Sequence, residues 1–379
     1  MSAGERETIA VNSELYVQAS PEARYLYDAH AQGLPMTTVV EEMSALKGRR
    51  ISPAVAEEAM QRVVGRIAAL AARGPKRSRF QLFMLPVVPP RAVNAVATVL
   101  CAAYAPLPAL LLLAASVSAV ALSFGLAHGA GRFGAGDWIA IFALFLATAV
   151  AHEFGHASAC RRFGLEPRSI GITAYLFMPA FYSDVTATWL LRPAQRLIVD
   201  LGGVFFQLIA IGVIACVAIA SDSALLRRAE LLSLVSIAVN VVPVFRFDGY
   251  WALADALAVP DLDRESFRTL CALLTRRPTP YAWPKRAALV AFALFNGAVW
   301  CYVAAFSVMT VAFVPGRVFP LLAQLASGHV TPDRLWSAIV AVTFFAFTAL
   351  GLVRITRVVA AALSAALATW RTTRASTRG

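Results

Sequence analysis

An apolar run that ends directly in ionisable side chains constrains this chain more than any other feature. From Ile139 to Ala151 the sequence contains only Ala, Thr and large apolar residues, and the pentapeptide His-Glu-Phe-Gly-His, residues 152–156, follows at once. Such a run, in this length range, is typical of a helix that crosses a membrane. Ionisable groups at membrane depth are costly, so the pentapeptide needs a charged partner or a water-filled cavity.

The spacing within the pentapeptide predicts a zinc site. Two histidines four residues apart on a helix lie on the same face, one turn from each other. His152 and His156 can therefore share one zinc ion, and Glu153 between them can act as general base on a zinc-bound water. The alternative is a chance H-E-x-x-H in an ordinary helix, which would leave these groups in or beside hydrocarbon without a ligand.

The composition supports an integral membrane protein. The chain has 379 residues, is 59% hydrophobic and carries a net charge of +12, and its mean hydropathy is +0.66. In a membrane protein, excess Lys and Arg first indicate cytoplasmic loops and not nucleic-acid binding. The 5 cysteines are scattered without C-x-x-C spacing, so no disulfide framework is implied.

The hydrophobic pattern predicts an all-α polytopic protein with about six transmembrane helices. Lys and Arg gather in residues 73–79, after the second span, in residues 264–286 and in the C-terminal tail. This distribution places both termini in the cytoplasm and brings the ends of the second and fourth spans to the same side. The predicted spans are residues 107–126, 138–159, 198–220, 231–244, 287–313 and 335–353.

Residues 1–75 predict a small soluble cytoplasmic domain. Tyr16–Gln18 favours a short strand, residues 35–43 carry a helix start signal with Thr at the cap, and residues 53–72 have apolar positions at helical spacing. One strand together with several short helices predicts a compact helical or winged-helix unit. A winged-helix unit could also bind nucleic acid. No nucleic-acid partner is expected here, because four glutamates reduce the positive charge of any basic face: Glu41, Glu42, Glu57 and Glu58.

The remaining boundaries follow from charge and proline. Residues 76–106 form a basic, proline-rich junction in which residues 91–104 are either an interfacial helix or the first part of a span. We expect a membrane core of four spans in residues 107–258, a charged cytoplasmic loop in 259–286, and two further spans with a basic tail in 287–379.

Two histidines leave a catalytic zinc ion one protein ligand short. Asp248 is the strongest candidate for the third ligand, because it follows a proline break at the end of an apolar helix, where a carboxylate needs a charged partner. A loop aspartate that makes a turn with Gly249 is the alternative, and Asp255 is a second possible ligand. The other histidines are expected in the soluble domain or on the far face: His30, His128 and His329.

Three further polar residues are candidates for substrate binding. Asn240, an amide inside the fourth predicted span, binds either the substrate or a neighbouring helix. Residues 164–197 are polar and aromatic, which favours a short hairpin at 175–190. In that hairpin, Tyr182 and Asp184 are predicted to lie beside an extended substrate strand that adds to the hairpin edge.

The two halves of this pattern resemble a known family. H-E-x-x-H in a membrane helix, followed two spans later by N-x-x-P-x-x-x-x-D-G, resembles the site-2 protease family of intramembrane zinc metalloproteases over residues 137–258. The resemblance implies a three-helix catalytic core with Zn²⁺ as cofactor and Glu153 as general base. It also implies the zinc ligands His152, His156 and Asp248.

Departures from the family pattern point to one branch of it. The family often has a second glycine after Asp-Gly, whereas Tyr250 and Trp251 follow here, and no PDZ-like insertion follows the first motif. Asp-Gly-Tyr-Trp together with a soluble N-terminal domain is similar to a bacterial branch of peptide zinc metalloproteases. The N-terminal domain is itself similar to PqqD-like domains, which bind leader peptides.

The resemblance implies a zinc metalloendopeptidase of the bacterial inner membrane that hydrolyses a membrane-associated or ribosomal-peptide precursor. Two alternatives stay open. One is a regulatory protease that releases a membrane-tethered transcription factor or anti-sigma factor, and the other is a non-catalytic transport or export accessory. An intact Glu153 disfavours the accessory, because a structural metal site needs no base. The substrate, the cleavage site and the oligomeric state are not specified by the sequence.

Overall fold

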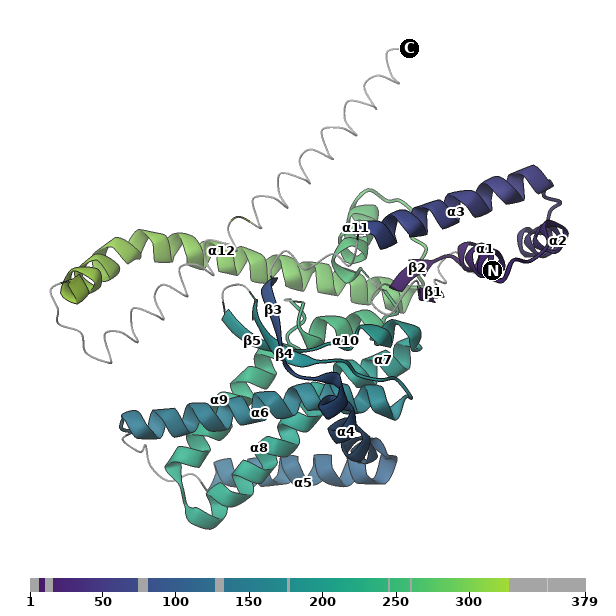
Figure 1. Ribbon diagram of the computed structural model, residues 1–379. Coiled ribbons are helices and arrows are strands. Elements are labelled where there is room, and N and C mark those ends of the chain that lie inside the picture. Colours follow the sequence, from purple (N-terminus) through teal and green to yellow (C-terminus); the bar gives the residue numbers. More distant parts are fainter. Residues whose placement is uncertain are drawn as a thin grey trace. The chain divides into compact units, whose positions relative to one another are not determined.

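The computed structural model of the chain is mostly helical (Figure 1). It describes residues 7–10, 16–73, 81–126, 133–175, 178–244, 246–259, 261–326 and 353. The chain falls into two compact units, which are described separately. The first contains residues 1–79, 84–173 and 181–260, and the second contains residues 80–83, 174–180 and 261–379.

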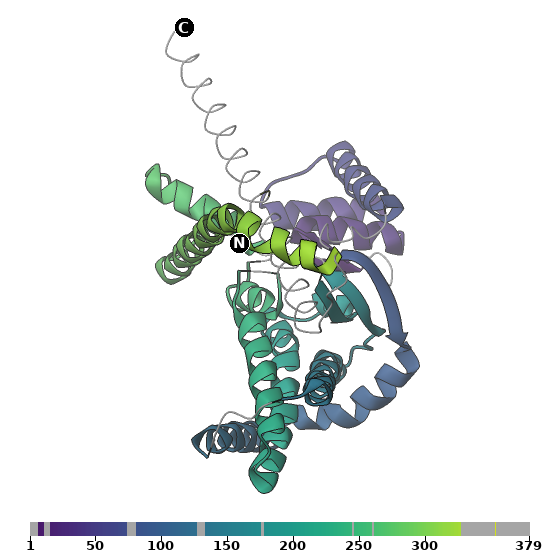
Figure 2. The ribbon, with the colours of Figure 1, turned by 90° about the vertical axis from the view of Figure 1, so that its left-hand side faces the viewer.

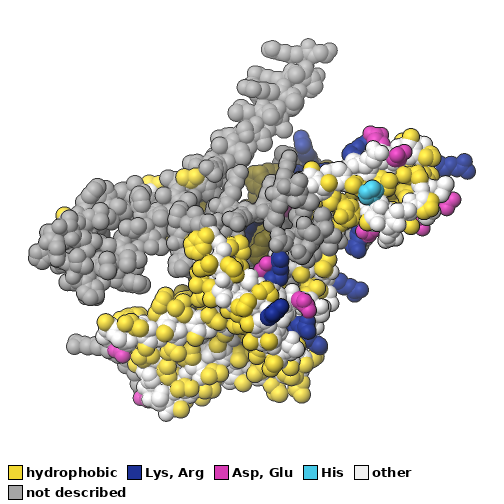
Figure 3. Space-filling view, in the orientation of Figure 1, with side chains coloured by type: hydrophobic (Ala, Val, Ile, Leu, Met, Phe, Trp, Pro, Cys, Tyr) yellow, Lys and Arg dark blue, Asp and Glu magenta, His cyan; other side chains and the backbone are white. Residues whose placement is uncertain are grey.

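Four helical segments among the described residues are long and apolar enough to cross a membrane. They match the first, second, third and fifth predicted spans. Hydrophobic side chains cover most of the visible surface of the helical bundle in the space-filling view (Figure 3), as a lipid-facing surface requires. The segments are α5 (Pro106–Gly125), α6 (Ala135–Arg162), α7 (Pro193–Asp200) with α8 (Gly202–Ser221), and α12 (Trp283–Ala326), of which Trp283–Phe306 is the apolar part.

The fourth predicted span overlaps α9 (Ala224–Val241), which starts earlier and ends earlier than expected. Its first half carries Arg227, Arg228 and Glu230, and these charges keep it out of the group of four apolar segments. The predicted sixth span, residues 335–353, lies outside the described residues except for Val353.

Within the first unit, α8 packs against α5, α6 and α9, and α6 also packs against α9 (Figures 1 and 2). Glycines allow the closest approaches. A Cβ on Gly155 of α6 would overlap the backbone of Gly202 at the start of α8, and a Cβ on Gly212 would lie 2.8 Å from Ser116 of α5. Small residues at such crossings let membrane helices pack backbone to backbone.

After α9 the chain turns and forms the short helix α10 (Asp248–Ala256), which packs against α7. The turn and the packing place the first residue of α10, Asp248, beside the pentapeptide of α6. The sequence expectation that the second and fourth spans end at the same level therefore agrees with the arrangement of α6 and α10.

A small sheet has the strand order β3 (Gln81–Val88), β4 (Ile170–Tyr175), β5 (Met178–Ser183). The predicted hairpin at 175–190 is therefore wrong in its position, since its strands occupy residues 170–183. The chain leaves β5 at Asp184, whose Oδ1 accepts hydrogen bonds from the backbone N–H and Oγ1 of Thr186. This side-chain turn ends the strand, and a short 3₁₀ helix, η2 (Thr186–Leu190), follows.

The junction before the first span contains α4 (Pro90–Leu100) and a 3₁₀ turn, η1 (Cys101–Tyr104). At 1.5 Å per residue, α4 is about 16 Å long and too short to cross a bilayer. It buries Val93 and Ala97 against Ala157 and Ile170. α4 and η1 end before α5 begins at Pro106, so residues 91–104 do not run on as one helix into the first apolar segment. Their position at the membrane stays a prediction.

The N-terminal residues form two antiparallel strands, β1 (Glu7–Ala10) and β2 (Tyr16–Ala19), and three helices. The sequence predicts a strand at the position of β2 and helices near residues 35–43 and 53–72, whereas it indicates neither β1 nor the helix at residues 21–32. Pro35, and not a threonine, precedes the first residue of α2, and it makes no side-chain cap. The helices share a core of Leu26, Ala29, Val39 and Met43, and their bounds are α1 (Pro21–Gln32), α2 (Met36–Lys47) and α3 (Pro53–Arg73).

The described part of the second unit contains α11 (Leu262–Leu274) packed on α12. The Asn296 amide of α12 donates a 3.2 Å hydrogen bond to Asp263 Oδ1 of α11. This polar contact fastens α11 to the apolar helix.

Candidate metal centre

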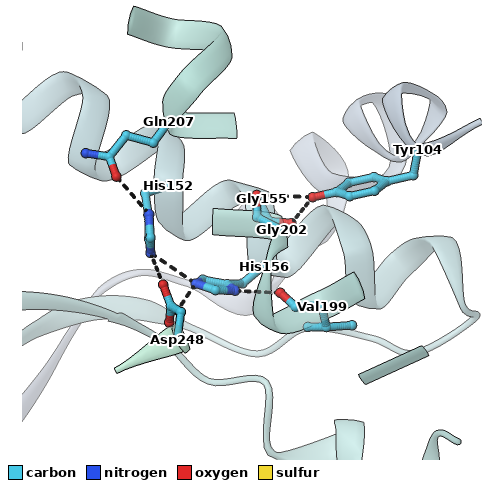
Figure 4. A network of polar contacts seen from close by, with 8 residues as sticks. All are labelled: Tyr104, His152, Gly155, His156, Val199, Gly202, Gln207 and Asp248. Atoms are coloured by element: carbon cyan, nitrogen blue, oxygen red, sulfur yellow. Dashed lines mark hydrogen bonds and ion pairs between the residues drawn. The ribbon is translucent and has the colours of Figure 1, made fainter. Parts of the chain in front are cut away.

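Three side chains from two helices converge at the end of α6 (Figure 4). His152 and His156 are buried on one face of α6, with their Nε2 atoms 3.1 Å apart. Asp248 opens α10, and its Oδ2 lies 2.8 Å from Nε2 of His152, while its Oδ1 lies 3.5 Å from Nε2 of His156. One ligand atom of each residue lies within 4.8 Å of the other two, a spacing that can hold a metal ion.

The hydrogen bonds of the two Nδ1 atoms decide which ring nitrogens face the space between the three side chains. Nδ1 of His156 lies 2.7 Å from the Val199 carbonyl oxygen, which can only accept, so this Nδ1 carries the hydrogen. Nδ1 of His152 lies 3.0 Å from Oε1 of Gln207, and donates to it in the same way. In the neutral form of each imidazole, Nε2 is then unprotonated and directs its lone pair toward the other ring and toward Asp248.

This arrangement of acceptors fits a bound cation. Asp248 presents its carboxylate to these two nitrogens. Its Oδ2 is buried and receives no hydrogen bond from the described residues. Two imidazole nitrogens and one carboxylate oxygen, with no hydrogen between them, form a donor set that suits zinc.

Glu153 follows His152 on α6 and is buried. It lies close enough to interact electrostatically with both histidines and with Asp248. Glu153 is not in the group of three residues that could hold a metal ion, and its role as general base stays a prediction.

The start of α8 passes directly over the imidazoles. A Cβ on Gly203 would lie 2.5 Å from Nε2 of His152 and equally close to His156, so a residue with a side chain does not fit there. Tyr104 fastens the same two helices, since its hydroxyl donates to the carbonyls of Gly155 at 2.8 Å and Gly202 at 3.3 Å (Figure 4). Burial raises the pKa of Tyr104, which keeps this hydroxyl a donor.

The remaining candidates from the sequence lie elsewhere. Asp255 is not a ligand, because its carboxylate is engaged by Arg196. His30 is exposed on α1, and His128 and His329 lie outside the described residues. The alternative in which Asp248 only makes a loop turn is also wrong, since Asp248 is the first residue of a helix.

The three predicted substrate-binding residues are not part of the ligand group. Asn240 is half-buried on α9, and no hydrogen bond joins it to the ligands within the described ranges. Tyr182 belongs to β5, where its ring packs against Gly171. Asp184 pairs with Arg168 at 3.3 Å and closes the turn after β5. A role for these residues in substrate binding stays a prediction.

Sequence reasoning missed Gln207, Tyr104 and the carbonyl of Val199. Gln207 offered a signal, because it is an amide within an otherwise apolar helix. Tyr104 lies outside the motifs, and a backbone carbonyl leaves no trace in the sequence.

Comparison with known proteins gives one distant similarity. No family model and no solved structure matches the chain. The chain is similar to "Putative peptide zinc metalloprotease protein YydH" of Bacillus subtilis (strain 168), with 29% identity over 130 residues, which is 34% of this chain and 51% of the relative. The chain thus spans about half the length of the curated relative that it matches. This similarity supports a relationship to zinc metalloproteases over part of the chain.

Proposed function

We propose that this protein is a membrane-embedded zinc metalloprotease. The observation that carries the proposal is the convergence of His152, His156 and Asp248, from two helices of an apolar bundle, beside the buried carboxyl group of Glu153. The partial similarity to a protein named as a zinc metalloprotease supports the same conclusion.

His152, His156 and Asp248 would hold the zinc ion, which would supply a positive charge to activate a water molecule and to polarise the scissile carbonyl. Gln207 and the Val199 carbonyl hold the imidazoles in the tautomer that leaves each Nε2 free to bind. Glu153 accepts the proton of the attacking water and returns it to the departing amine. The apolar helices around the group exclude bulk water, which strengthens each of these electrostatic interactions.

The proposed substrate is a membrane-associated peptide or a ribosomally made precursor peptide, bound in an extended form. An extended form is required because the hydrogen bonds of a helix occupy its carbonyls. β5 is the last strand of the sheet in the order β3-β4-β5, so it has an edge to which such a segment can add. Tyr182 lies on this strand, and Asp184 ends it.

We place the protein in the bacterial cell membrane with both termini in the cytoplasm, on the distribution of Lys and Arg. A regulatory protease that releases a transcription factor or an anti-sigma factor would use the same residues on another substrate. A non-catalytic transport or export accessory is disfavoured, because a structural metal site has no use for Glu153.

The substitution Glu153→Gln tests the proposal, because it removes the base and leaves every ligand in place. Peptides in membranes from cells that express the wild type or the variant are compared by mass spectrometry, and the zinc content of both purified proteins is measured. The proposal expects equal zinc and a precursor that accumulates with the variant. Equal processing by a variant that holds zinc would refute the enzyme.

A further inference from the structure

A buried ionic contact joins α10, which carries Asp248, to α7, which carries the Val199 carbonyl beside His156. Nε of Arg196 lies 2.8 Å from Oδ1 and 2.9 Å from Oδ2 of Asp255, and Nη2 lies 2.6 Å from Oδ1. Nη1 donates to the Leu191 carbonyl at 3.1 Å. The two side chains are only 10% and 11% exposed. The guanidinium group therefore uses most of its donors within the protein.

The positions of these residues connect the pair to the metal centre. On α10, Asp255 follows Asp248 by two helical turns, so both carboxylates lie on one face of the helix. On α7, Val199 follows Arg196 by about one turn, and its carbonyl holds the Nδ1 of His156. The ion pair joins α7 and α10 directly, and Asp248, His156 and the Val199 carbonyl connect the same two helices a second time through α6. The two connections lie about two turns apart along α10 and about one turn apart along α7.

Aromatic rings complete the contact. The Arg196 guanidinium lies 5.1 Å from the centre of the Trp189 ring. Trp189 meets Trp251 of α10 edge to face at 6.4 Å, and Trp251 meets Tyr250 at 5.2 Å. Tyr250 stands in place of the second family glycine, and Trp251 follows it. Both aromatic residues therefore pack α10 toward Arg196.

A buried ion pair is weak evidence for stability, because the cost of desolvating two charges offsets their attraction. A bidentate pair does have a strict geometry, and this sets the spacing and register of the helices it joins. α10 is only 9 residues long, and a helix of that length is marginal by itself, so its position depends on such contacts.

We propose that Arg196 and Asp255 are positioning residues, which hold α10 against α7 so that Asp248 faces the two imidazoles before a metal ion binds. This inference rests on the proposed metal centre. In the described part of the chain, no hydrogen bond or ion pair joins the Arg196–Asp255 pair to the side chains of His152, His156 or Asp248. The Arg196–Asp255 pair restricts the movement of Asp248 away from His152 and His156.

The test measures zinc affinity by competition with a chromophoric chelator, and thermal unfolding in the metal-free state, on the full chain in detergent. The double variant Arg196→Met/Asp255→Leu replaces the pair by apolar side chains, a change that buried pairs often tolerate without loss of stability. The matched control is Arg227→Gln, which breaks the 2.7 Å pair of Arg227 with Asp222 at the start of α9.

We expect the double variant to unfold at the wild-type temperature but to bind zinc about tenfold or more weakly, within the range seen when supports of metal ligands are removed. The control should bind like the wild type. In an Asp248→Ala background the double replacement should have no further effect on zinc affinity, because Asp248 is the group that the pair positions.

If the double variant does not fold, Arg196→Lys gives the same test, since it keeps the charge and loses the bidentate geometry. Wild-type zinc affinity in the variant that folds would overturn the positioning role and leave the metal centre standing. A wild-type protein that binds no zinc would instead overturn the proposed function, so the two failures are distinct.

Discussion

Oδ2 of Asp248 lies 2.8 Å from Nε2 of His152, and the hydrogen of that imidazole is on its other nitrogen. Two acceptors at this distance repel each other unless a cation lies between or beside them. The buried group is therefore arranged for a metal ion, and removal of any one member should be measurable as a loss of metal affinity.

The first prediction concerns Asp248. Asp248→Asn keeps the shape of the side chain and removes its charge, so we expect zinc affinity to fall by more than about 100-fold, beyond the loss caused by removing a support of a ligand. Chelator competition measures it. Asp222→Asn, at an exposed carboxylate that pairs with Arg227, is the control and should bind like the wild type. An Asp248→Asn protein with undiminished affinity would exclude this carboxylate from the site.

The second prediction concerns Gln207, which sequence reasoning overlooked. Gln207→Leu leaves Nδ1 of His152 without its acceptor and frees the imidazole to adopt the other tautomer. Zinc affinity should fall about 10–100-fold, as measured by the same competition. Gln61→Leu, on the exposed face of α3, is the matched control. If both variants bind equally, Gln207 does not orient the ring.

The third prediction uses two glycines. Gly203→Ala places a methyl group against both imidazoles, whereas Gly297→Ala on α12 meets nothing within 4 Å. We expect the first variant to lose zinc binding and the second to keep it, since the ligand rings must move to admit the new atom. Zinc content after purification distinguishes the two. Full zinc occupancy in Gly203→Ala would contradict the close approach of α8.

The sequence predicts that His152, His156 and Asp248 come together, as they do in the structure, because helical spacing aligns the two histidines and the loop charges place Asp248 at the same end of the bundle. That they bind zinc stays a proposal. The sequence predicts the hairpin poorly, since the hydrogen bonds of Asp184 with Thr186 end the strand within the aromatic stretch. It leaves Asp255 open as an alternative ligand, because the partner that engages this residue, Arg196, comes from a helix remote in sequence. Contacts between distant segments, and those made by backbone carbonyls, need the folded chain.

The fourth prediction concerns Tyr104. Tyr104→Phe removes the hydroxyl that links Gly155 to Gly202, which should cost about 1 kcal/mol of unfolding free energy. Burial raises the pKa of Tyr104 above its ordinary value of 10.0. Its contribution is therefore fully present below pH 10 and declines as the pH rises further.

Thermal unfolding of the wild type and the variant across this pH range measures both effects. Tyr302→Phe, at an exposed ring on α12, is the control. A Tyr104→Phe protein as stable as the wild type would show that the hydroxyl does not hold α6 to α8.

We propose that the imidazoles of His152 and His156 and the carboxylate of Asp248 bind a single zinc ion. A zinc-edge X-ray absorption spectrum of the purified protein tests this proposal most directly. We expect nitrogen and oxygen neighbours at about 2.0–2.2 Å from the zinc ion, with the scattering pattern of two imidazoles and without sulfur. A sulfur shell at about 2.3 Å, or a spectrum with no histidine contribution, would contradict the proposal.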